Sequence, residues 1–272
     1  MRIPVLFLLC VVGAGFVASA QPPSLGGVWK ADLEKSKLGP QPPPSSYLVI
    51  IEQDGYKFNE LTGVWTQRGE QRSRMTFNAD GKPAVILYRG IPTRVTAVIS
   101  GANKIEVKEE AAGRDSVTRV EYLLSADGQT LTVNAKSVDN GKERDSTIVL
   151  VRQPDSAGDP LRKPEDSAAE RFKNVKTAMK NMPASQFLDT MRYFTFSLGT
   201  DCEFCHVERK FDADDKKEKR TAREMIAMAT GINETSFQGK QKVRCYTCHQ
   251  GHHEPWRRPL FAGETPQDDE IE

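Results

Sequence analysis

The chain has little cysteine and histidine, and beyond its first twenty residues it has no long apolar run. Five cysteines and four histidines stand among its 272 residues. No later stretch is apolar enough to cross a bilayer as a helix, so the mature chain is expected to be soluble. An excess of charge is also missing, since 38 Lys and Arg balance 37 Asp and Glu. This balance argues against a nucleic-acid partner or an anionic membrane surface.

The one apolar run lies at the N-terminus and has the three parts of an export signal. Arg2 supplies the positive start, residues 5–12 the short apolar centre, and residues 18–20 (Ala-Ser-Ala) the cleavage site. Residues 1–20 are therefore predicted to be a cleaved signal peptide, which places the mature protein in the periplasm. An uncleaved membrane anchor is the alternative, and the shortness of the run argues against it. Cys10 would be removed with the signal.

The four remaining cysteines form two Cys-x-x-Cys-His motifs, which consist of Cys202, Cys205 and His206, and of Cys245, Cys248 and His249. Two thiols at this spacing can form thioether bonds to the vinyl groups of one haem, and the following imidazole can bind its iron. Disulfides, the usual fate of cysteines in an oxidising compartment, need no trailing histidine. We therefore predict a c-type cytochrome with two covalently bound haem c groups.

Residues 25–152 predict a domain made of strands. Short β-rich runs alternate with turn signals such as Asp54-Gly55 and Asn140-Gly141, with no helical period between them. This pattern indicates an antiparallel barrel or sandwich. The predicted runs are 27–30, 47–51, 84–88, 93–98, 104–107, 118–124, 130–133 and 147–151. Gly27-Val28-Trp29-Lys30, followed by residues 36–40, resembles the start of bacterial lipocalin-like domains, which implies a barrel.

The second half of the chain changes to a helical period. Residues 153–168 are rich in proline and charge and are predicted to be a linker. The fold class is thus multidomain, with the all-β barrel followed by a mostly α dihaem cytochrome c domain at residues 169–258. The acidic end, residues 259–272, is expected to be disordered. Helical segments are expected around Phe172, Val175 and Met179, from Pro183 to Gly199, and from Lys219 to Thr230.

Methionines on these helices are candidates for the second axial position of each iron. Met191 precedes the first motif on a face shared with Phe187 and Phe194, and its thioether could bind iron or simply fill a helical core. Met225 and Met228 precede the second motif, and their spacing does not choose between them. His252 and His253 follow the second motif and are expected to be solvated. The charged run 208–223 is expected to be a solvated face, with Lys216, Lys217, Lys219 and Arg220 as an alternative docking surface.

Residues 174–251 resemble the multihaem cytochrome c subunit of photosynthetic reaction centres. The similarity lies in Phe187-Leu188-Asp189-Thr190-Met191, in Gly199-Thr200-Asp201 before the first motif, in residues 211–215, in Arg223-Glu224-Met225, and in Val243-Arg244 before the second motif. The resemblance implies that Met191 completes the first haem and Met225 the second. That family carries four haems where this chain offers two, and a β-rich N-terminal domain is not expected in it.

We therefore expect an electron carrier and no enzyme, with two His/Met-ligated haems, a protein electron donor and a protein electron acceptor. Peripheral contact with a membrane redox complex, and a small apolar ligand inside the barrel, are open alternatives. A dihaem peroxidase would need one open iron with an acid–base group nearby. A zinc site built from both cysteine pairs would need no haem. A ligand-binding barrel with an attached redox domain is a further alternative.

Overall fold

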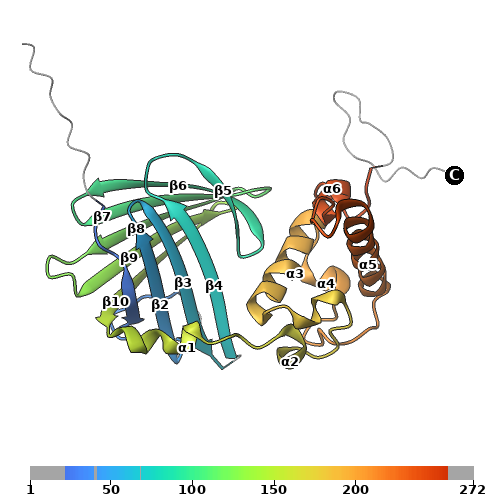
Figure 1. Ribbon diagram of the computed structural model, residues 1–272, viewed down its shortest axis with the longest axis horizontal. Helices are drawn as coiled ribbons and strands as arrows, with labels where there is room; N and C mark the ends of the chain where they lie inside the picture. Colours follow the sequence, from blue (N-terminus) through green and yellow to red (C-terminus); the bar gives the residue numbers. More distant parts are fainter. Residues whose placement is uncertain (1–21, 40–41, 68, 257–272) are drawn as a thin grey trace, which may run out of the picture.

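The computed structural model describes residues 22–39, 42–67 and 69–256, and Figure 1 shows a β-barrel and a helical region side by side. The predicted signal peptide (1–20) and acidic tail (259–272) lie outside the described residues. None of the helices in the described ranges is both long and apolar enough to span a membrane.

Ten antiparallel strands form the N-terminal part, in the order β4-β3-β2-β1-β10-β9-β8-β7-β6-β5. The edge strands β4 and β5 lie next to each other, so the sheet curls into a nearly closed barrel. This confirms the predicted antiparallel barrel. The strands are β1 (Gly27–Ala31), β2 (Ser46–Asp54), β3 (Lys57–Thr66), β4 (Gly69–Asn78), β5 (Ala84–Tyr88), β6 (Ile91–Gly101), β7 (Lys104–Ala111), β8 (Ser116–Leu124), β9 (Thr130–Asp139) and β10 (Lys142–Gln153).

The barrel interior is filled by the inward-facing side of each strand, as the period of two requires. Trp29 is fully buried, and its indole Nε1 donates to the Leu25 carbonyl at 2.9 Å. Phe58 and Phe77 stack at 5.2 Å between ring centroids. A second apolar cluster lies on the outer face of β1 and β2 and consists of Val28, Leu48, Ile50 and Leu161.

Carboxyl groups also lie inside the barrel. Glu60 accepts hydrogen bonds from Tyr122 Oη at 2.9 Å and from Thr62 Oγ1 at 3.0 Å. Burial raises the pKa of Glu60. Burial, together with the charge of Glu60, raises the pKa of Glu109 to about 7. Burial also raises the pKa of Tyr88 to about 12. One part of the barrel interior is therefore apolar, and another part contains the carboxyl groups of Glu60 and Glu109, of which Glu60 is hydrogen-bonded.

Two strands, β3 and β4, were absent from the strand runs read from the sequence. In β3 the inward-facing Glu60 and the Gly63 interrupt the apolar alternation, while β4 has only Met75 and Phe77 as large buried side chains. Both strands are nevertheless paired along their whole length. The pairing of β2 with β3 and of β3 with β4 outweighs the weak pattern.

Residues 153–168, expected to be a linker, contain the 3-10 helix η1 (Asp155–Gly158) and helix α1 (Asp159–Arg162). Leu161 is buried on the outer face of the barrel. Arg72 of β4 holds the segment by donating to the carbonyls of Pro160, Leu161 and Lys163 at 2.8–3.1 Å. The segment is therefore attached to the barrel and does not hang free between the two parts.

The helical region consists of α2 (Ala168–Arg171), η2 (Ala178–Asn181), α3 (Ala184–Leu198), α4 (Cys202–Cys205), α5 (Lys217–Phe237) and α6 (Cys245–His249). The helix from Pro183 to Gly199 is confirmed, because Pro183 is the N-cap of α3 and Gly199 its left-handed C-cap. The expected helix through Phe172 and Met179 is wrong, because Asn174 has φ of 62° and breaks it.

The predicted end of the third helix at Gly231 is also wrong. Helix α5 continues to Phe237 and ends at Gln238, which takes the left-handed conformation. A helical glycine lowers stability by about 1 kcal/mol without forcing an end. The side chain of Asn233, two residues further on, is buried in contact with the following loop, and this packing holds the extra turns in place.

Three turns of the barrel, each with a glycine, touch the helical region. Gly90, in the turn between β5 and β6, lies so close to α3 that an added Cβ would stand 2.0 Å from the Asp189 carbonyl oxygen. Gly113 lies against the ring of Phe196, and Gly69 against Arg171. The same end of the barrel therefore supports α3, the helix that carries Met191.

Candidate functional site

The helical region buries almost no apolar side chains of its own. From residue 169 to residue 256, Ala184 is the one hydrophobic residue that is buried, alongside the polar Ser197, Lys219 and Asn233. Its aromatic and methionine side chains remain half-buried or exposed. Large half-exposed apolar faces on a small helical region mark a binding surface for an apolar group. This chemistry fits a domain that completes its core around haem.

The first motif is built on α4, a single helical turn. Asp201 caps it, since its Oδ1 accepts a hydrogen bond from the Phe204 N–H at 3.0 Å. Residues three apart on a helix share a side, so Cys202 and Cys205 point in similar directions. Neither thiol is in a disulfide, and burial raises the pKa of Cys205.

His206 follows this turn and is held by one ring nitrogen. Its Nδ1 lies 2.8 Å from the carbonyl oxygen of Phe211, which can only accept, so Nδ1 carries the proton. The lone pair is then on Nε2, the arrangement that metal-bound histidines adopt. Burial is the main cause that lowers the pKa of His206, and a neutral imidazole is what iron binding needs.

The second motif repeats this arrangement. Helix α6 contains Cys245, Cys248 and His249, and the chain then turns through Gln250 and Gly251, both at positive φ. This turn brings the carbonyl of His252 to 3.0 Å from His249 Nδ1. His249 therefore also presents Nε2 as its free ligand atom. Burial raises the pKa of the Cys245 thiol.

The two histidines after the second motif lie beside aromatic rings. The ring of His252 is 4.8 Å from that of Trp256, and the exposed ring of His253 is 5.6 Å from that of Phe204 in the first motif. Gly251 donates its N–H to the Ser197 carbonyl at 2.9 Å. The loop after the second motif thus runs over the end of α3, next to the first motif.

The candidate methionines occupy the two long helices. Met191 lies half-buried on α3. On α5, Met225 is 39% exposed and Met228 is 49% exposed. Helix α3 packs against α6, where Phe196 and Tyr246 stack at 5.2 Å, and α5 packs against α4. By contrast, α3 and α4 make few close contacts, and so do α5 and α6.

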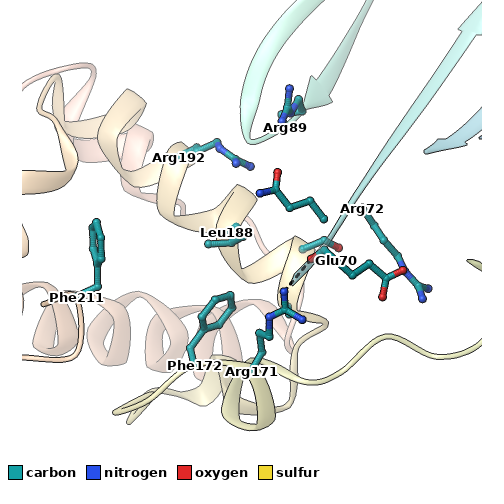
Figure 2. Close-up of a pocket in the computed structure, with 11 residues that line it drawn as sticks. Glu70, Arg72, Arg89, Arg171, Phe172, Leu188, Arg192 and Phe211 are labelled. Carbon is teal, nitrogen blue, oxygen red and sulfur yellow. Dashed lines mark hydrogen bonds and ion pairs between the residues drawn. The ribbon is translucent and has the colours of Figure 1, made fainter. Parts of the chain in front are cut away.

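A cavity of about 300 Å³ lies between the barrel and the helical region. Its barrel side includes Glu70 and Arg89, its helical side Leu188 and Arg192, and Phe211 reaches it from the loop after His206. In Figure 2, Arg192 extends from α3 toward the barrel, and a dashed line joins Arg171 to the Glu70 carbonyl, a 3.1 Å hydrogen bond. The cavity therefore reaches Phe211, whose carbonyl holds His206, and its rim carries several arginines. Two of them are already paired, Arg192 with Asp189 at 2.6 Å and Arg72 with Glu70 at 2.7 Å.

The sequence interpretation missed Lys219 and Asn233. The run 208–223 was expected to be a solvated face, but Lys219 is only 9% exposed and donates from Nζ to the carbonyls of Phe211 and Ala213. Asp214 holds the same loop by accepting from Arg223 and Lys176, both at 2.9 Å. Helical spacing could have indicated that these two residues are buried, because Lys219 and Asn233 lie seven residues before and after Ile226, on the same face of α5.

The zinc alternative requires the four cysteines around one ion. Within residues 22–39, 42–67 and 69–256, no three His, Cys, Asp or Glu side chains are gathered to hold a metal ion. The two cysteine pairs are instead on separate helices, each followed by its own histidine.

Two helical turns each present a pair of thiols and are followed by a histidine held through Nδ1, and these are the residue types and the order that haem attachment in a c-type cytochrome domain requires. By fold and site, the chain joins such a domain to a β-barrel. The family model of the photosynthetic reaction centre cytochrome C subunit matches residues 127–266, slightly more than half of the chain. The chain belongs to this family, a family of haem c-binding electron carriers. The match starts before β9, so it includes the last two barrel strands.

The chain is similar to solved structures over its N-terminal half. Apo lipid binding protein 8 of Caenorhabditis elegans is 11% identical, covers 47% of this chain and 94% of its own, and gives a TM-score of 0.37. A Schistosoma mansoni fatty acid binding protein in complex with arachidonic acid is 12% identical, covers 47% and 96%, and gives 0.32. No curated protein sequence matches the chain.

Proposed function

We propose that the chain is an exported dihaem cytochrome c that passes single electrons between a protein donor and a protein acceptor. The observation that carries this proposal is the repeated histidine geometry. Both His206 and His249 follow a Cys-x-x-Cys turn, and both direct Nδ1 to a backbone carbonyl at 2.8–3.0 Å. When bound, the haem iron supplies one-electron exchange between its ferric and ferrous states.

Met191 and Met225 are proposed as the second axial ligands of the first and second iron. The helix packing supports this pairing. A helix packed directly on another lies about 8–10 Å from it, axis to axis, which leaves no room for a porphyrin between them. Because α3 packs on α6 and α5 on α4, the helix pairs that can be parted by a haem are α3 with α4 and α5 with α6.

Arginines on the rim of the cavity near the first motif can bind carboxylates, and Arg192 already binds that of Asp189 at 2.6 Å. Arg89 of the barrel and Arg192 of α3 both line the cavity, with Leu188 and Phe211 as apolar wall. A haem carries two propionate groups on an apolar ring, so these residues would favour its binding at this place. The barrel would then act as part of the support of the first haem.

The proposal is tested on the exported, purified protein by counting haem per chain and recording oxidised and reduced absorption spectra. Two low-spin c-type haems and a methionine–iron band are expected. A high-spin component would instead favour the peroxidase alternative, and absence of haem would refute the proposal. The same preparation, examined by intact mass, should begin at Gln21 if the signal peptide is cleaved.

Substitutions of the motif cysteines and of the methionines test which residues attach each haem and which bind its iron. Replacing Cys245 and Cys248 together by alanine should leave one haem, and two retained haems would refute the attachment sites. Met191→Ala should permit carbon monoxide binding, with Met182→Ala as the matched control on the same region. Met225→Ala should do the same for the second iron, and Met228→Ala should not. A low-spin, ligand-inert Met191→Ala protein would show that Met191 only packs.

A further inference from the structure

The Phe211 carbonyl, which accepts a hydrogen bond from His206, also accepts one from a second side chain. Phe211 O accepts from His206 Nδ1 at 2.8 Å and from the ammonium of Lys219 at 2.9 Å. Lys219 also donates to the Ala213 carbonyl at 2.7 Å, so its Nζ is fixed between two backbone oxygens. A positive charge thus lies one carbonyl group away from the histidine proposed to bind the first iron.

This charge is desolvated and only partly neutralised. Lys219 is 9% exposed, and its nearest carboxylate, that of Asp214, is 3.3 Å away. The same carboxylate also binds Arg223 and Lys176, both at 2.9 Å. One negative charge therefore serves three positive ones, and the local charge beside His206 is net positive. In a poorly hydrated place such a charge acts more strongly than at the surface.

The Lys219 ammonium would influence the iron in two ways, and both would raise its reduction potential. A hydrogen bond from Nδ1 to an acceptor makes a metal-bound imidazole more electron-donating, and this favours ferric iron. Sharing the acceptor with an ammonium weakens that bond, and the nearby positive charge disfavours the additional charge of ferric iron. Each change raises the reduction potential, since hydrogen bonding and nearby charge are among the protein's means of setting it.

We propose that Lys219 is a positioning residue that raises the reduction potential of the haem held by His206, through the Phe211 carbonyl that the two side chains share. This inference rests on the proposed function. Reduction adds one electron, taken from a chemical mediator in the test below, and makes or breaks no bond to His206.

The experiment is a spectroelectrochemical titration of the holoprotein and three variants. Lys219→Met should lower one of the two midpoints, with a change of about tenfold in the ferrous-to-ferric ratio at fixed potential, about 59 mV for one electron. Asp214→Asn removes the counter-charge and should raise the same midpoint. Lys217→Met removes an exposed lysine of the same helix and should move neither midpoint.

The midpoint that moves should be the one retained when Cys245 and Cys248 are replaced by alanine. Opposite shifts in the Lys219 and Asp214 variants cannot come from loosened structure, which would move the midpoint in the same direction in both. An unmoved midpoint, or equal shifts, would overturn the role of Lys219. If Lys219→Met fails to bind haem, the sign of the Asp214→Asn shift decides. Wild-type protein without haem would refute the proposed function itself.

Discussion

The side chain of Asn233 on α5 is hydrogen-bonded to the loop at 240–243 that leads into the second motif. Replacing it should lower the unfolding free energy of the helical region. Its Oδ1 accepts from the N–H groups of Lys242 and Val243, both at 2.9 Å. Its Nδ2 donates to the carbonyls of Val243 at 2.7 Å and Ala229 at 2.9 Å. The Asn233 residue is 7% exposed, so its side chain makes all four hydrogen bonds in a largely buried place.

The expected loss for Asn233→Ala is about 2–4 kcal/mol of unfolding free energy. A buried hydrogen bond contributes about 0.5–1.5 kcal/mol net, and an unpaired buried partner costs about 1–3 kcal/mol. The sum for four bonds is reduced because the loop at 240–243 can move out to water once it is released. Asn233→Asp should cost at least as much, since an oxygen would then face the carbonyls of Val243 and Ala229.

Urea unfolding measures this effect when two signals are followed. Far-UV circular dichroism at the helical band reports on the helical region, and tryptophan fluorescence reports on the barrel through Trp29 and Trp65 once Trp256 is replaced by phenylalanine in every variant compared. A loss of 3 kcal/mol corresponds to a midpoint shift of about 1–3 M urea. The matched control is Thr235→Ala, which removes an exposed hydroxyl bonded within the same helix. Equal midpoints for the Asn233 and Thr235 variants would refute the reasoning.

Two further predictions concern the barrel. Because Glu109 has its pKa raised from about 4.5 to about 7, the folded state binds more protons than the unfolded one between these values, and stability should fall as pH rises from 4.5 to 7. Glu109→Gln should reduce this fall by up to about 3 kcal/mol in urea titrations, and an unchanged pH profile would contradict it. Gly90→Ala should destabilise the protein by about 1–3 kcal/mol more than Gly81→Ala, because both glycines have φ near +80° but only Gly90 abuts α3. Equal thermal shifts for the two would show that the contact with α3 contributes little.

The barrel was predictable from sequence where strands alternate clearly and turns carry glycine. Asn140-Gly141 predicted a tight turn, and both residues have positive φ between β9 and β10. The strands β3 and β4 were not predictable in the same way, because Glu60 faces inward and β4 is mostly polar. What fixes them is hydrogen-bonded pairing in the consecutive hairpins β2-β3 and β3-β4, which the apolar alternation within a single strand does not contain.

At the candidate site, the order of residue types in each motif leads to the prediction of two haem attachment sites and of one histidine ligand for each iron, and this stays a prediction. The residues that contact the motif histidines through the backbone were not predictable. Lys219 stands in a run that reads as solvated because seven of the ten residues from Lys216 to Met225 are charged. Its inward position follows from the fold of the 207–216 loop, whose Phe211 and Ala213 carbonyls face α5 and bind Lys219. Asn174, which has a positive φ, holds this loop through a hydrogen bond to Asp214.

The two parts of the chain meet at α3, so the barrel supports the helix that carries the candidate ligand Met191. Gly90 and Gly113 let barrel turns approach α3 closely, at Asp189 and Phe196. Met191 lies between these two contacts in sequence, and Phe196 also stacks on Tyr246 of the second motif. A helix supported at both points has little freedom to tilt. The barrel end therefore constrains the helix that packs on the second motif and carries Met191, and the family match extends from this helix into β9 and β10.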